Sequence, residues 1–156
     1  MEKIMEATSK SVLTYTSKII TLWTVFLLGT LFHTQLALMP LFHGMEVTES
    51  HAHDFASVNF IFWFMFFFFL IPLVAIVTAT FSQSKQFRNF HFWLTVVYSI
   101  LNFLHLVIDA MISVPRYQIL LMGFLFVVGL LLNLVSYQWK KESLVTVPIE
   151  KSKFKH

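Results

Sequence analysis

The side chains best suited to chemistry are a histidine and an aspartate in the third long apolar stretch of the chain. His105 and Asp109 are four residues apart, so on an α-helix they lie on one face, one turn from each other. At this spacing both can bind one metal ion, or the carboxylate can orient the imidazole. The sequence contains no cysteine. Imidazole and carboxylate ligands without sulfur suit the divalent ions of Zn, Cu, Fe or Mn, and the choice among these ions stays open.

Further polar residues extend this face along the whole apolar stretch. They recur at spacings of three or four: His91, Thr95, Tyr98, Asn102, His105 and Asp109. Inside a membrane such a stripe cannot face lipid, and an ionisable residue there indicates a functional site. We expect the outer half of the stripe, from Asn102 to Asp109, to carry the function. The inner half, up to Tyr98, has little more than Asn133 opposite it and is expected to serve helix packing.

The composition predicts that this stretch is one of several membrane-spanning helices. The chain has 156 residues, of which 57% are hydrophobic and 12% charged, whereas a soluble domain carries about 25% charged residues. Four apolar stretches exceed the roughly 20 residues that a helix needs to cross a bilayer. They cover residues 19–42, 55–81, 90–112 and 117–138, all approximately. The predicted fold is an all-α integral membrane protein with a four-transmembrane-helix bundle.

The distribution of basic residues predicts the orientation. With four spans both termini lie on one side, and of the 11 Lys and Arg residues only Arg116 falls on the other. The positive-inside rule then makes both termini cytoplasmic. The expected organisation is a cytoplasmic segment 1–18, a transmembrane domain 19–138 with an outer loop 43–54, and a cytoplasmic tail 139–156. Because the basic residues flank the spans, they indicate orientation rather than binding of nucleic acid.

Several residues are expected to lie at the depth of His105 and Asp109. His33 is about nine residues from the outer end of the first span and His105 about seven from that of the third, which places them within a few ångströms of one level. His51 and His53, in the outer loop, are expected to close the site from above as further metal ligands. Three residues are expected to hydrogen-bond and orient these ligands: Asn59, Tyr98 and Asn102.

Three classes of function follow from these residues. The first is a His/carboxylate metal site that serves redox or hydrolytic chemistry on a lipophilic substrate, or handles the metal itself. The second is a non-catalytic subunit or assembly factor of a larger membrane complex. The third is an electron carrier with one haem b between His33 and His105. In each case the protein is expected to be a multi-pass protein of a bacterial plasma membrane or an internal membrane, in contact with lipid and with other membrane subunits or further copies of itself.

Overall fold

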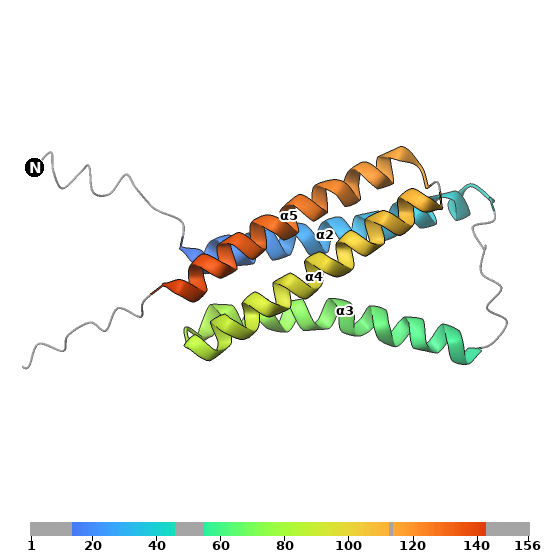
Figure 1. Ribbon diagram of the computed structural model, residues 1–156. Coiled ribbons are helices and arrows are strands. Elements are labelled where there is room, and N and C mark those ends of the chain that lie inside the picture. Colours follow the sequence, from blue (N-terminus) through green and yellow to red (C-terminus); the bar gives the residue numbers. More distant parts are fainter. Residues whose placement is uncertain (1–13, 46–54, 113, 143–156) are drawn as a thin grey trace, which may run out of the picture.

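The computed structural model describes residues 14–45, 55–112 and 114–142, and this part of the chain is all-helical (Figure 1). The helices are α2 (Tyr15–Phe42), α3 (Phe55–Phe81), α4 (Lys85–Met111) and α5 (Arg116–Lys141). Each is long and apolar enough to cross a membrane. The predicted all-helical fold with four helices long and apolar enough to be spans is therefore confirmed.

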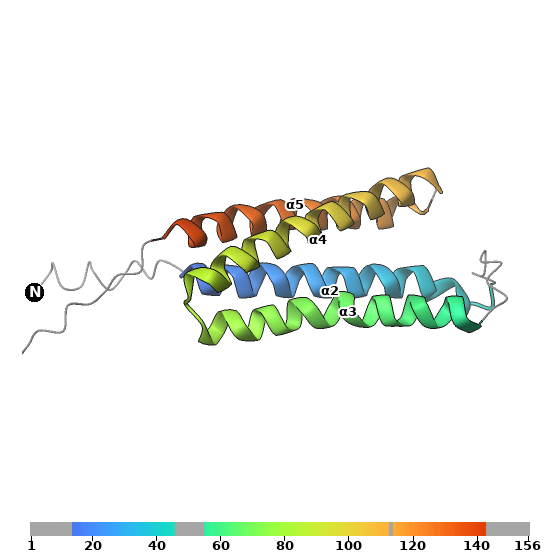
Figure 2. The same ribbon diagram turned by 60° about the horizontal axis from the view of Figure 1, so that its bottom comes forward.

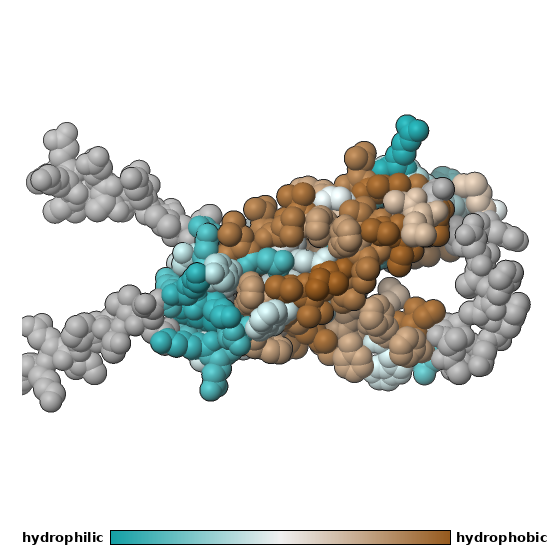
Figure 3. Space-filling model, viewed as in Figure 1, coloured by the Kyte–Doolittle hydropathy of each residue, from teal (hydrophilic) through white to brown (hydrophobic). Residues whose placement is uncertain are grey.

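The helices run alternately up and down along one common direction. The start of α2, the turn between α3 and α4 and the end of α5 lie at one end of the molecule (Figures 1 and 2). Hydrophilic side chains gather at this same end, whereas the length of the molecule is mainly hydrophobic (Figure 3). Four of the basic residues that the sequence places there are Lys18, Lys85, Lys140 and Lys141. We call this the inner end, and the opposite one the outer end.

Three of the four helices form the core, and the fourth lies beside them. α5 packs closely against both α2 and α4, and buried side chains of all three helices belong to one hydrophobic cluster. The core includes Ile19, Trp23, Phe26, Met122, Leu125, Val128, Leu132 and Trp139. α3 buries Pro72, Ala75 and Ala79 towards its inner end, but every side chain from Asn59 to Phe67 is exposed. The outer half of α3 accordingly lies apart from α4 (Figures 1 and 2).

Local sequence signals explain where the helices begin and end. Thr14 and Ser84 accept hydrogen bonds from the backbone N–H of Ser17 and Phe87, each at 3.2 Å, as N-cap residues do. Both helices thus start a turn before the apolar stretches predicted from the sequence. Pro40 lies inside the last turn of α2, which continues to Phe42 and ends just before Gly44, whose φ is 71°.

At the inner end a buried histidine joins all three core helices. The Trp23 indole N–H donates to His91 Nε2 at 2.9 Å, and His91 Nδ1 lies 3.2 Å from Ser136 Oγ. Because an indole nitrogen only donates, Nε2 must be the acceptor, so the proton is on Nδ1 and is donated to the serine. Asn133, expected opposite this part of the stripe, instead donates to Ser99 at 2.9 Å. The packing role predicted for His91 is consistent with these contacts, but its partners were not foreseen.

A buried arginine closes the same end. Arg88 is 4% exposed and donates to the carbonyl oxygens of Trp139 and Glu142, both at 3.1 Å, and to Gln83 Oε1 at 3.1 Å. Its guanidinium also lies over the Trp139 ring. A cation that binds the last carbonyls of a helix stabilises the negative end of the helix dipole. Arg88 therefore fixes the start of α4 against the end of α5.

Trp23→Phe is expected to lower the free energy of unfolding by about 1–3 kcal/mol, because His91 Nε2 becomes a buried acceptor without a donor. Trp93→Phe is the matched control, since this indole is 57% exposed on the same bundle; its effect should stay within ~0.5 kcal/mol. Unfolding of the detergent-solubilised protein, followed by circular dichroism, measures both. Equal effects of the two substitutions would contradict the structural role of the Trp23–His91 hydrogen bond.

Candidate metal centre

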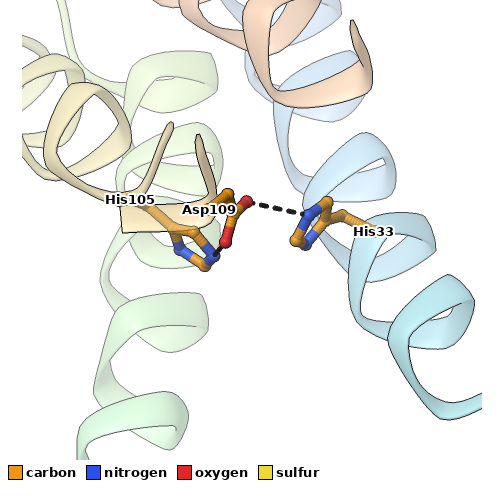
Figure 4. Close-up of side chains that lie close together, drawn as sticks. All are labelled: His33, His105 and Asp109. Atoms are coloured by element: carbon orange, nitrogen blue, oxygen red, sulfur yellow. Dashed lines mark ion pairs between the residues drawn. The ribbon is translucent and has the colours of Figure 1, made fainter. Parts of the chain in front are cut away.

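Three ionisable side chains meet between α2 and α4 in the outer half of the molecule (Figure 4). His33 projects from α2, and His105 and Asp109 project from successive turns of α4. Asp109 lies between the two imidazoles: its Oδ2 is 3.1 Å from His33 Nε2 and its Oδ1 is 3.4 Å from His105 Nε2. The three residues that the depth count placed at one level therefore lie together.

The two helices hold these residues in different environments. His33 and Asp109 are buried, at 6% and 4% exposure, whereas 51% of the His105 side chain is exposed. α2 and α4 run in the same direction, so the Trp23–His91 hydrogen bond at the inner end also sets their register at the outer end. The carboxylate is thus enclosed, and only the His105 side of the cluster faces outwards.

The distances within the cluster fit a shared metal ion. Two ligands on one tetrahedral ion lie about 3.3 Å apart when each bond is ~2.0–2.1 Å long. The observed separations of 3.1 and 3.4 Å between carboxylate oxygens and imidazole nitrogens bracket this value. One ligand atom from each of the three residues can be chosen so that all lie within 4.8 Å of one another. Side-chain movements of up to about 1.5 Å would bring all three atoms to the spacing of ligands on one ion.

Two buried atoms of the cluster face each other as an ion pair without a well-aligned hydrogen bond. His33 Nε2 and Asp109 Oδ2 are fully buried, and neither has a hydrogen-bond partner of acceptable geometry within the described residues, although they are only 3.1 Å apart. Buried polar atoms without partners are costly and require an explanation, such as an ion. A buried carboxylate also needs a compensating positive charge. A cation that accepts lone pairs from both atoms would meet both requirements.

The ring geometry favours a single ion over a haem. The His33 and His105 rings are 5.3 Å apart between centroids and nearly perpendicular, in an edge-to-face contact. Axial histidines of a haem bind from opposite faces of the porphyrin, with the iron between them. Here the two rings touch each other, and the Asp109 carboxylate contacts both, so the porphyrin plane has no room between them.

The structure places three of the other predicted site residues at different positions, and it does not describe the remaining two. His51 and His53 fall outside the described residues. Asn59 is exposed on α3, and Tyr98 donates its hydroxyl proton to the carbonyl oxygen of Phe68 at 2.8 Å, which ties α4 to α3 rather than orienting a ligand. Asn102 is buried, and its Oδ1 has no hydrogen-bond partner in the described part of the chain. Of the three residues expected to orient the ligands, only Asn102 adjoins the centre.

A cavity of about 290 Å³ adjoins the cluster on its His105 side, between α3 and α4. His105 and Asn102 form its polar wall, and the remaining lining is mainly apolar: Thr30, Phe64, Phe68, Leu101, Leu104, Ile108 and Met122. These apolar lining residues were not predicted from the sequence. Phe64 and Phe68 belong to an almost uniformly aromatic stretch, so no sequence signal separates them from neighbours that face outwards.

Comparison of the chain with protein-family models, with curated proteins and with solved structures finds no match. The function must therefore be inferred from the geometry of the site itself.

Proposed function

We propose that this chain is a membrane-embedded metalloprotein that binds one divalent transition-metal ion through His33, His105 and Asp109. The observation that supports the proposal is the convergence of two imidazoles and one buried carboxylate, two of whose atoms lack hydrogen-bond partners. Zn, Cu, Fe and Mn all accept this ligand set. Two histidines and one carboxylate are also the ligands of many non-haem iron enzymes.

The number of ligands favours chemistry over a purely structural role. Structural zinc sites are usually closed by four protein ligands, whereas catalytic sites keep a position open for water or substrate. His33, His105 and Asp109 supply three ligands, and the His105 side of the cluster faces an apolar cavity. Such a cavity suits a lipophilic molecule better than a hydrated ion. We therefore propose redox or hydrolytic chemistry on a lipophilic substrate; a bound metal would supply Lewis acidity or electron transfer.

Within this proposal the protein residues have separate tasks. Asp109 supplies the negative charge that retains a cation in an apolar setting. His33 anchors the ion to α2 and thereby makes metal binding depend on the α2–α4 register. His105, half exposed at the cavity wall, is the ligand nearest to an incoming substrate.

A second function, as a subunit of a larger membrane complex, is favoured by a separate observation. A groove of about 360 Å³ between α4 and α5 contains Ser99 and Asn133 among apolar residues such as Phe103 and Phe126. The buried Oδ1 of Asn133 has no partner within the described residues. A helix of another subunit, or of a second copy, could donate a hydrogen bond there.

We further propose that the inner end is cytoplasmic, as the excess of basic residues predicts. The metal centre would then lie in the half of the membrane that faces away from the cytoplasm. The outer loop with His51 and His53 would lie above it, where either histidine could occupy the open position when no substrate is bound.

Alanine at His33, His105 or Asp109 is expected to weaken Zn²⁺ binding by more than about tenfold, because even groups that only orient a ligand contribute 10–100-fold. His43→Ala is the matched control; this exposed histidine follows the last residue of α2 and its loss should leave the affinity unchanged. Elemental analysis of the purified protein and Zn²⁺ titration by calorimetry in detergent provide the measurements. Similar affinities for all four variants and the natural chain would contradict the proposed ligands.

The absence of cysteine makes the orientation testable with single-cysteine variants. In sealed vesicles with the cytoplasmic face inside, a membrane-impermeant maleimide should label Met45→Cys at the outer end and leave Gln86→Cys at the inner end unlabelled. Detergent should then expose both thiols. Labelling of Gln86→Cys alone would reverse the proposed orientation, and labelling of both in sealed vesicles would contradict the four-span topology.

A further inference from the structure

The cavity beside the metal centre opens sideways, at the surface of the helix bundle. Four of its lining residues expose about half of their surface: Phe64 (53%), Leu104 (51%), Ile108 (55%) and the His105 side chain (51%). Its floor is closed by Met122 of α5, which is 1% exposed. The opening follows from the fold, because the outer half of α3 stands apart from α4. In a bilayer this opening would face the hydrocarbon core.

The size and lining of the cavity restrict what it can hold. Pockets that bury a whole small molecule measure about 300–1,000 Å³, so a cavity of about 290 Å³ suits only the end of a long molecule, with the remainder in the surrounding lipid. Neither Lys nor Arg is among its described lining residues. Among these side chains an anionic group would lose its hydration without gaining a basic partner. A neutral molecule is therefore favoured.

One polar group in the cavity requires a partner. Asn102 is 4% exposed, and its Oδ1 meets no hydrogen-bond donor among the described residues. In an apolar environment an unpaired amide oxygen costs several kcal/mol, and no water is available in hydrocarbon to satisfy it. Asn102 belongs to the same wall as His105. Because Oδ1 has almost no accessible surface, the Asn102 amide must rotate towards the cavity before a hydroxyl group on a bound molecule can donate to it. That hydroxyl group would then lie beside His105, a proposed metal ligand.

We propose that this cavity binds the hydroxyl-bearing end of a neutral, long-chain lipophilic alcohol, which enters laterally between α3 and α4 and hydrogen-bonds to Asn102. This inference rests on the proposed function only in identifying the alcohol as the substrate of the metal centre. The hydroxyl group adjoins His105, and the hydrocarbon chain passes between Phe64, Leu104 and Ile108 into the membrane. Recognition of the alcohol thus requires one hydrogen bond to its hydroxyl group and an apolar chain, but no charged group on the ligand.

Photolabelling tests the proposal with two probes, a sixteen-carbon primary alcohol with a diazirine in its chain and the matching alkane without the hydroxyl. The alcohol should label the peptides of α3 and α4 that line the cavity about fivefold more than the alkane does, which is the effect of one hydrogen bond. Asn102→Leu should remove this preference. Equal labelling by both probes in the natural chain, or an alcohol preference that survives Asn102→Leu, would overturn the role of Asn102.

Two neighbouring substitutions on α4 test the position of the cavity. Ile108→Trp should block the opening and abolish the alcohol preference, whereas Val107→Trp, on a residue outside the cavity lining, should leave it intact. Labelling spread evenly over all helices, or equal effects of the two substitutions, would overturn the proposed site. Circular dichroism of each variant identifies loss of folding. Should Ile108→Trp not fold, Leu104→Phe is the smaller substitution at the opening, and it too should reduce the preference.

The same samples separate this inference from the metal site. Zn²⁺ binding should be unchanged in Ile108→Trp, because Ile108 is neither a proposed ligand nor a residue expected to orient one. Alcohol labelling that persists in a chain without metal affinity would refute the metalloprotein while retaining the lipid site. Metal binding without selective labelling would refute only the lipid site.

Discussion

The structure depends most on how a carboxylate is accommodated in an apolar helix. Asp109 is 4% exposed, and an ionised carboxylate at such a position is strongly unfavourable unless a positive charge accompanies it. The only ionisable groups that the described chain brings to it are His33 and His105. The approach of α2 to the outer half of α4, the gathering of the two histidines and the proposed metal ion all follow from this single requirement.

The polar stripe of α4 has two parts with different physical properties. At the inner end His91 uses both ring nitrogens in contacts with Trp23 and Ser136, so it has no ligand position left. At the outer end His33 Nε2 and Asp109 Oδ2 remain without hydrogen-bond partners. A satisfied network makes its surroundings rigid, and an unsatisfied one is available to a ligand. The contacts of His91 at the inner end thus hold the core helices in register, whereas His33 and Asp109 at the outer end can bind a ligand.

The sequence predicted the four helices and the depth of the site well. The length of the apolar stretches determines the helices, and the number of residues from the end of each stretch determines the depth. The cluster of His33, His105 and Asp109 was foreseen in this way. Depth does not determine which side of a helix faces which neighbour, and therefore Asn59 and Tyr98 were assigned to a site that they do not join. Trp23 and Arg88 were missed as polar partners: an indole resembles an apolar residue in sequence, and an arginine near a span resembles a surface charge. The lateral position of α3 has no sequence signal, since its aromatic side chains suit lipid and protein equally.

X-ray absorption spectroscopy of the Zn²⁺-loaded protein in detergent reports the ligands of the ion itself and so tests the proposed metal site. We expect only nitrogen and oxygen neighbours at about 2.0–2.2 Å, with the outer-shell scattering of at least two imidazoles, one of which disappears in His105→Ala. The His43→Ala protein should give the spectrum of the natural chain. A spectrum without imidazole scattering, or one that His105→Ala leaves unchanged, would contradict a metal centre at this site.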